Sequence, residues 1–333
     1  MSVQNAFRSP SKNPGVARPL RLLLTGGGGA GTEAMWSLLS RTYDVWIADA
    51  DRNRIHPAVP RDRARSIPFA GDNDFVDAIV DLCRMESIDV LVPGVDEELL
   101  ALSRSAEALL PTQVMIPPTE FIETMLDKWL FFEALQASDI ATPLTVKLDQ
   151  CDDWDDFPLI VKPRHGRGSR GVSVIDNRNG LMHYRGALGI RASHYVVQQK
   201  LDGVEFTVQV FSNRDGDLKA VIPARIALKR GVTISCETDP VPAVIALCET
   251  IHSRFEVSGC YNVQGVLGHD GIFIPFEINP RVSTTLCLSV AAGIDPIAAF
   301  LGGPEGSAPA RVETTWKLER FWTNYIHSVE DEA

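Results

Sequence analysis

The residues best suited to chemistry lie in segment 274–281, which reads IPFEINPR. Glu277 and Asn279 are two positions apart, so on an extended strand both side chains point to the same face. Carboxylate and amide oxygens suit a hard cation such as Mg²⁺, which proteins bind with one or two carboxylates and substrate phosphates. Arg281 adds a guanidinium that fits phosphate oxygens. The segment indicates a metal and phosphate site, with an ordinary strand end as the alternative.

Gln264 extends this candidate site from a second strand. Counting back from the turn at Asp270 and Gly271 places Gln264 opposite Glu277 on the neighbouring strand. Gln264, Glu277 and Asn279 then form an oxygen cluster with one formal charge. Such a cluster suits Mg²⁺ completed by nucleotide phosphates, and it is too weakly charged for a stand-alone Ca²⁺ or Zn²⁺ site.

Segment 158–172, PLIVKPRHGRGSRGV, predicts a phosphate site. Lys162 ends an apolar strand and needs an anionic partner, because an unpaired buried charge is costly. The glycines that follow let backbone N–H groups approach phosphate oxygens. A basic surface hairpin would explain the glycines but not Lys162. Segment 196–205 is a strand, a turn and a strand that could carry an adenine on its backbone and a ribose on Glu205, or be an ordinary connection.

The N-terminal part predicts a parallel α/β sheet. A strand at 20–25 is followed by GGGGAG at 26–31, a helix to 41, and a strand at 45–48 that ends at Asp49. This pattern matches a dinucleotide-binding turn, or a strand-to-helix turn without a ligand. A helix at 72–87 and further strands at 89–92 and 114–116 continue the alternation, and the domain is expected to close near 117. Residues 1–18 are expected to be a flexible tail.

The second half predicts antiparallel sheets. A single helix is expected from an N-cap at Thr119 to about 137, and another helix covers 241–255. Short strands are expected at 159–162, 172–175, 195–199, 205–211, 220–223, 262–268 and 271–278, with a hairpin at Asp215 and Gly216. The whole chain is therefore expected to combine an α/β domain with an α+β domain.

Composition narrows the classes of partner. The chain has 333 residues, 45% of them hydrophobic, with a net charge of −11. This acidity argues against a broad nucleic-acid or anionic-membrane surface. Six scattered cysteines without a C-x-x-C pair are typical of reduced thiols, and no run is long enough for a membrane span. We therefore expect a cytoplasmic protein.

Five motifs occur in the order seen in the ATP-grasp superfamily. They are Asp127-Lys128, VKP with GRGSRGV, VVQQ with Glu205, NVQ and FEINPR. Over most of residues 20–300 the chain resembles the branch related to the carbamoyl-phosphate synthetase large subunit. The resemblance implies a Rossmann-like pre-ATP-grasp domain at 19–117, in which the glycine turn binds no NAD. An ATP-grasp domain of two antiparallel-sheet subdomains would follow at 118–333, with a lid subdomain at about 143–200.

The resemblance also implies roles for individual residues. Lys128 and Lys162 would contact ATP phosphates, with Lys162 also near the adenine, under a mobile loop at 166–171. Gln264 and Glu277 would hold one Mg²⁺ and Glu277 and Asn279 another, and Mn²⁺ could substitute. The other predicted nucleotide contacts are Gly166, Gly168, Ser169, Gly171, Gln199, Lys200, Leu201 and Glu205. Lys162, Arg281 and Arg225 would act on the transferred phosphoryl group.

The implied activity is ATP-dependent ligation of a carboxylate to an amine through an acylphosphate, with small-molecule acid and amine substrates. Phosphorylation of carbamate or bicarbonate is an alternative, as are an NAD-linked oxidoreductase and a non-catalytic nucleotide sensor. Gln199 and Lys200 replace the Glu and aromatic residue more often found in the family, and 282–285 replaces a glycine-rich turn. The sequence therefore does not name the acid or the amine. A homodimer is common among relatives.

Overall fold

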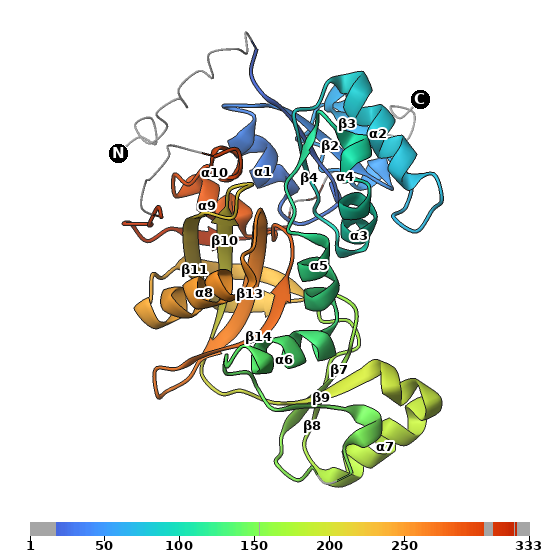
Figure 1. The fold of residues 1–333 in the computed structure, drawn as a ribbon, viewed down its shortest axis with the longest axis vertical. Coiled ribbons are helices and arrows are strands. Elements are labelled where there is room, and N and C mark those ends of the chain that lie inside the picture. The colour runs from blue at the N-terminus through green and yellow to red at the C-terminus, as the bar shows by residue number, and fades with distance from the viewer. Residues whose placement is uncertain (1–17, 153, 303–308, 323, 325–333) are drawn as a thin grey trace.

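The computed structural model describes residues 18–152, 154–302, 309–322 and 324. They form three sheets, which Figure 1 shows as an upper layer, a middle layer and a smaller lower lobe. Apart from Arg18, the predicted N-terminal tail lies outside the described residues. Across the described ranges, no helix combines the length and apolar character needed to cross a membrane.

The N-terminal sheet is parallel, as predicted, and its strand order is β3-β2-β1-β4-β5. Buried leucines of β1 and an amphipathic α2 explain why this segment folds as a covered parallel sheet. The strands are β1 (Arg21–Leu24), β2 (Asp44–Asp49), β3 (Ala64–Ser66), β4 (Val90–Val92) and β5 (Gln113–Val114). The helices are α1 (Thr32–Leu39), α2 (Phe75–Glu86), α3 (Asp96–Arg104) and α4 (Ala106–Leu109).

The single helix predicted from Thr119 to about 137 is wrong. The chain forms two helices, α5 (Thr119–Leu126) and α6 (Lys128–Ala137). Asp127 separates them because its backbone is extended and its carboxylate accepts a hydrogen bond from the N–H of Trp129, as a helix N-cap does. Thr119 is the first residue of α5, and Pro118 occupies the cap position. Because of this break, α6 begins facing the lower lobe.

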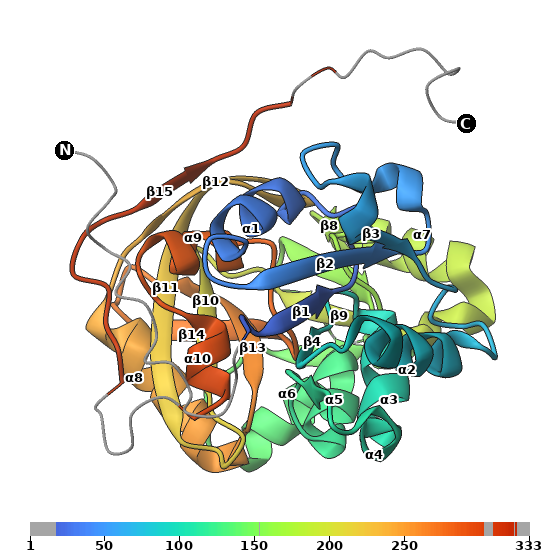
Figure 2. The same ribbon diagram turned by 90° about the horizontal axis from the view of Figure 1, so that it is seen from above.

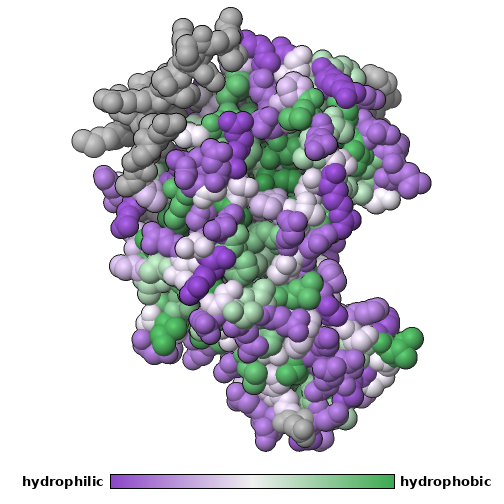
Figure 3. All heavy atoms as spheres, in the orientation of Figure 1, coloured by the Kyte–Doolittle hydropathy of each residue, from purple (hydrophilic) through white to green (hydrophobic). Residues whose placement is uncertain are grey.

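The lower lobe is a four-stranded antiparallel sheet with the order β6-β9-β7-β8. Its strands are β6 (Thr145–Lys147), β7 (Leu159–Pro163), β8 (Ser173–Ile175) and β9 (Tyr195–Gln199), and α7 (Arg178–Leu188) covers it. A hydrophobic core that includes Leu148, Leu159 and Leu181 belongs to this lobe alone. Figure 3 shows that a notch on one side of the molecule separates the lobe from the rest.

The middle layer is a six-stranded sheet with the order β14-β13-β10-β11-β12-β15. Its strands are β10 (Val204–Ser212), β11 (Leu218–Arg230), β12 (Val232–Thr238), β13 (Cys260–Leu267), β14 (Phe273–Asn279) and β15 (Lys317–Glu319). Helix α8 (Pro242–Phe255) packs on one face, through a core that includes Val208 and Val244. The other elements are α9 (Leu286–Ala291), α10 (Pro296–Phe300) and the 3-10 turns Arg52–Arg54, Arg61–Arg63, Leu148–Gln150 and Gly189–His194.

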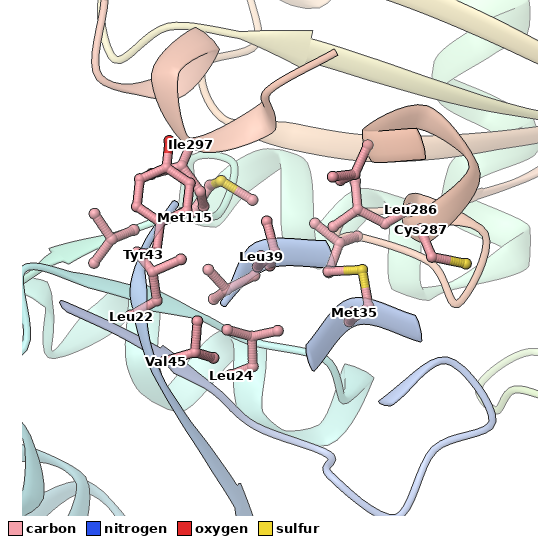
Figure 4. Close-up of a cluster of buried hydrophobic side chains, with 14 of the residues drawn as sticks. Leu22, Leu24, Met35, Leu39, Tyr43, Val45, Met115, Leu286, Cys287 and Ile297 are labelled. Carbon is pink, nitrogen blue, oxygen red and sulfur yellow. The ribbon is translucent and has the colours of Figure 1, made fainter. Parts of the chain in front are cut away.

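The upper and middle layers share one hydrophobic core. Leu22 of β1 and Leu39 of α1 belong to the same cluster as Leu286 of α9 and Ile297 of α10, and Figure 4 shows these side chains facing one another. Phe211 of β10 joins the cluster from the middle sheet. From above, α9 and α10 lie between the N-terminal sheet and the middle sheet (Figure 2). These two layers therefore form one packed body, to which the lower lobe is attached.

Candidate active site

A cavity of about 540 Å³ lies between the lower lobe and the middle sheet. The predicted residues that line it are Lys128, Lys162, Gly166, Gly168, Ser169, Gln199, Lys200, Leu201, Glu205 and Glu277. They come from α6, β7, the loop after β7, the end of β9, β10 and β14. Four segments that lie far apart in the sequence thus meet at one cationic cavity, which is large enough for a nucleotide.

Three lysines converge on Glu277. Lys128 Nζ lies 3.2 Å from Glu277 Oε1 and donates to the carbonyl of Gly166 at 2.9 Å. Lys162 Nζ donates to Gln198 Oε1 at 2.8 Å and to the carbonyl of Phe276 at 3.3 Å. Lys162 is buried, and its position in an apolar strand predicted an anionic partner. Glu277 supplies that negative charge.

The third lysine, Lys229, was not predicted. Its Nζ lies 2.5 Å from Glu205 Oε1 and 3.0 Å from Gln264 Oε1. The predicted strand stopped at 223, whereas β11 continues to Arg230 through two register shifts. Ile226 before Gly231 and the β-branched run at 232–234 after it were the signal that could have revealed the longer strand.

The charges in this cluster shift one another's pKa values. The pKa of Lys162 is lowered to about 8: burial is the largest cause, Lys128 and Lys229 also lower the pKa, and Glu277 opposes them. Burial alone would raise the pKa of Glu277, but the three lysines, Lys128 foremost, hold it below its usual value. Glu277 is therefore ionised at neutral pH, and the three cations around it leave an excess of positive charge for an anionic ligand.

The predicted pairing of Gln264 and Glu277 on neighbouring strands is confirmed. Gln264 of β13 pairs with Glu277 of β14, next to a register shift at Gly265, and Asn279 follows on β14. All three line a second cavity, of about 640 Å³, and Glu277 lines both cavities. One carboxylate and two amides fit Mg²⁺ that takes further ligands from phosphates, since Mg²⁺ seldom has an all-protein cage. These residues would hold the metal at the junction of the two cavities.

The loop after β7 covers the first cavity. Gly166, Gly168 and Gly171 have positive φ angles, and a Cβ on Gly171 would lie 2.9 Å from the ring of Pro163. Arg167 in this loop lies 3.1 Å from Glu97 of α3, which ties the loop to the N-terminal domain. Gly166, Gly168 and Ser169 line the cavity. Gly171 does not line it and sets the path of the loop.

Arg281 follows the oxygen cluster and lines the second cavity. Its guanidinium is largely buried and forms an ion pair with Asp96 at the start of α3. The side chain is therefore held at the junction of the N-terminal domain and β14, beside Asn279. A predicted contact between Arg281 and a phosphoryl group requires the guanidinium to share its donors between Asp96 and that group.

Arg225 is not at the site, contrary to expectation. It pairs in register with Phe206, whose side chain belongs to the core under α8, so Arg225 lies on the sheet face opposite Glu205 and Gln264. Its guanidinium is bound by Glu237 and Asp239 instead. Because side chains alternate along a strand, the two register shifts in β11 bring Lys229 to the site face.

We expect Arg225→Gln to leave ATP binding and turnover within about twofold of the wild type, because its ion pairs are half-exposed and worth less than about 1 kcal/mol. Lys229→Gln is the matched change on the same strand and should weaken ATP binding roughly tenfold. Calorimetric titration with ATP and Mg²⁺ measures both. A larger loss in Arg225→Gln than in Lys229→Gln would contradict this assignment.

Asp49, the acidic residue after the glycine turn at 26–31, stabilises the backbone of the turn and its surroundings. Asp49 accepts hydrogen bonds from the N–H groups of Gly28, at 2.8 Å, and Asp51, at 3.0 Å. A dinucleotide-binding turn would leave that carboxylate for a ribose hydroxyl. Gly28 and Asp49 line the second cavity together with the oxygen cluster. The turn thus belongs to the wall of the second cavity.

The fold and site define a protein with a cationic, lysine-lined cavity between two antiparallel sheets. The same fold occurs in N5-carboxyaminoimidazole synthetase of Staphylococcus aureus complexed with ADP (TM-score 0.66, 16% identity, covering 86% of this chain and 78% of that one). Two family models match the sequence. Residues 191–324 match "ATP-grasp in the biosynthetic pathway with Ter operon", and residues 128–235 match "D-ala D-ala ligase C-terminus". The matched residues, 128–324, are therefore similar to the ATP-grasp superfamily.

Curated relatives agree with this placement. Phosphoribosylamine–glycine ligase of Thermococcus kodakarensis is 27% identical over 220 residues, which are 62% of this chain and 48% of that protein. The carbamoyl phosphate synthase large chain of Thermomicrobium roseum is 26% identical over 159 residues, which are 41% of this chain and 14% of that protein. The match covers about half or less of the length of these relatives.

Proposed function

We propose that the protein is an ATP- and Mg²⁺-dependent carboxylate–amine ligase that releases ADP. The observation that carries this proposal is the position of Glu277, which lies between three lysines and lines both a nucleotide-sized cavity and a second cavity for small molecules. The named activities of phosphoribosylamine–glycine ligase and of the D-Ala–D-Ala ligase family support it. The product would be an amide-type bond between two small molecules.

In this proposal the substrate carboxylate attacks the γ-phosphorus of ATP, an acylphosphate forms and ADP leaves. An amine then attacks the acyl carbon, and phosphate leaves with the electron pair of the broken C–O bond. Lys128, Lys162 and Lys229 neutralise phosphate charge, because phosphoryl transfer depends mainly on positioning and charge stabilisation. Closure of the 166–171 loop excludes water from the acylphosphate.

Gln264, Glu277 and Asn279 would hold two Mg²⁺ ions, with Glu277 shared, and Mn²⁺ would substitute. When bound, the metal supplies Lewis-acid neutralisation of the nucleotide phosphates. At the other end of the cavity, the backbone at Lys200 and Leu201 would contact the adenine. Glu205 would contact the ribose, in competition with Lys229. The six cysteines are unpaired and buried, which supports a reducing compartment such as the cytoplasm.

A second candidate is phosphorylation of carbamate or bicarbonate, which the match to the carbamoyl phosphate synthase large chain favours. Both candidates use the same ATP site and differ in the occupant of the second cavity. An NAD-linked reaction is disfavoured because Asp49 is engaged by Gly28.

The test is phosphate release from ATP and Mg²⁺ with a matrix of small carboxylic acids, amino acids and amines, including bicarbonate with ammonia. We expect release that needs one acid and one amine together, with a new amide detected by mass spectrometry. Release with bicarbonate alone would favour the second candidate. ATP binding without turnover on any combination would indicate a sensor, and stabilisation by NAD(H) but not by ATP would defeat the ligase proposal.

A further inference from the structure

The second cavity reaches the carboxyl ends of the strands in the N-terminal sheet. In the order β3-β2-β1-β4-β5, β2 and β3 follow on one side of β1, whereas β4 and β5 lie on its other side. The crevice between the ends of β1 and β4 is therefore the topological switch point, the place where open α/β sheets bind ligands. Thr25 follows β1, and Gly94 and Glu98 follow β4. Glu98 lines the second cavity at this point.

Glu98 is a buried carboxylate with a single neutral partner. The side chain is 4% exposed, and Oε2 accepts a hydrogen bond from the Thr25 hydroxyl, which itself accepts one from the N–H of Gly94 at 3.1 Å. Within the described part of the chain, no basic side chain forms an ion pair with Glu98, and Oε1 receives no hydrogen bond. A carboxylate in this state is costly unless a cation or a proton joins it.

The other carboxylates that line this cavity already have partners. Both oxygens of Asp49 accept backbone N–H groups. Glu97 is paired with Arg167 at 3.1 Å, and Glu277 with Lys128 at 3.2 Å. Glu98 is thus the carboxylate whose charge the protein leaves unmatched in this wall of the cavity.

We propose that Glu98, positioned by Thr25, binds the ammonium group of a small-molecule substrate at the switch point of the N-terminal sheet. The inference rests on the proposed function for the role of the second cavity, which is about 640 Å³ and large enough for a free amino acid. The oxygen cluster lines the same cavity, so a molecule held at Glu98 shares this space with the reacting phosphate.

The charges around Glu98 suit a cation. The pKa of Glu98 is raised to about 7: burial is the largest cause, Asp49 and Glu97 also raise the pKa, and the Thr25 hydrogen bond and Arg167 oppose them. An ammonium group would restore the ionised form. Affinity for that group should therefore fall as the pH drops through about 7, where Glu98 takes up a proton in the free protein.

The test is direct binding, which needs no turnover. Protein saturated with a non-hydrolysable ATP analogue and Mg²⁺ is screened by ligand-observed NMR against the twenty proteinogenic amino acids and their N-acetyl derivatives. We expect at least one free amino acid to bind and its N-acetyl form, which lacks the ammonium group, to bind at least about tenfold more weakly. Glu98→Gln should weaken the free amino acid by a similar factor, remove the pH dependence and leave the affinity for the ATP analogue unchanged.

Glu107→Gln, an exposed change on α4, is the matched control and should bind like the wild type. Absence of binding by every free amino acid, or equal affinity in Glu98→Gln and the wild type, would overturn the ammonium site. The two proposals can fail separately. If the protein ligates an amino acid and Glu98→Gln ligates it equally well, the ammonium site is wrong and the ligase proposal stands. If amino-acid binding is lost in Glu98→Gln but the wild type shows no turnover, the ligase proposal is wrong and the ammonium site stands.

Discussion

Glu277→Gln is expected to reduce turnover by at least about 10³-fold, because it removes the one formal negative charge of the oxygen cluster. The amide keeps the size of the side chain but cannot neutralise the metal or balance Lys128 and Lys162. Phosphate release with the active substrate pair measures the effect. ATP binding in the absence of Mg²⁺ should be retained, since the cationic lysines remain.

Stability must be separated from activity in this variant. Removing one member of a buried ion pair costs about 3 kcal/mol or more, so Glu277→Gln should also unfold at a lower temperature. Glu277→Asp retains the charge and should unfold nearer the wild-type temperature, with activity between the wild type and Glu277→Gln. Full activity in Glu277→Gln would remove Glu277 from the metal site.

Lys162→Met should weaken ATP binding by about 10- to 100-fold, because a hydrogen bond to a charged group contributes about 1.5–3 kcal/mol. Loss of the lysine removes an unfavourable buried charge but also the attraction to Glu277 and the hydrogen bond to Gln198, so these effects oppose one another and stability should change little. Titration of ATP measures the affinity. Lys317→Met, on the exposed β15, is the matched control and should bind ATP like the wild type.

The pH dependence gives Lys162 a second signature. Its folded pKa of about 8 lies below the usual value of 10.5, so the free fold disfavours the protonated lysine. Any stability that this group contributes is largest above the unfolded pKa and is lost as the pH falls through about 8. ATP favours the charged form, so ATP affinity should be high below pH 8 and decline as the pH rises above it. A wild-type pH profile that persists in Lys162→Met would assign the titration to another group.

Much of the fold and part of the site could be predicted because local signals decided them. Counting back from the turn at Asp270 and Gly271 placed Gln264 and Glu277 on paired strands, although it is the register shift at Gly265 that brings Gln264 opposite Glu277. A lysine in an apolar strand marked Lys162 without any knowledge of its partners. The first prediction needed only residues close in sequence, and the second needed only one unmatched charge.

The errors arose where tertiary contacts override local patterns. Asp127 sits in a helix-like run, but its N-cap bond and its pairing with Arg164, at 2.5 Å, break the helix. Arg225 and Lys229 point to opposite faces of the middle sheet because of register shifts in β11, and these shifts leave no clear mark in the sequence. Glu98 looks like an ordinary acid at a helix start, and its significance depends on burial beside Thr25.

The shared core beneath α1, α9 and α10 limits how such a protein can be re-engineered or recombined. Leu22 and Leu39 interdigitate with Leu286 and Ile297, so the first hundred residues are not an exchangeable module. A chimaera that takes a new N-terminal sheet from another protein must also take the matching segment after β14. The lower lobe, whose core is its own, has no such constraint. Replacement of the N-terminal sheet in this architecture should therefore require paired changes on both sides of that core.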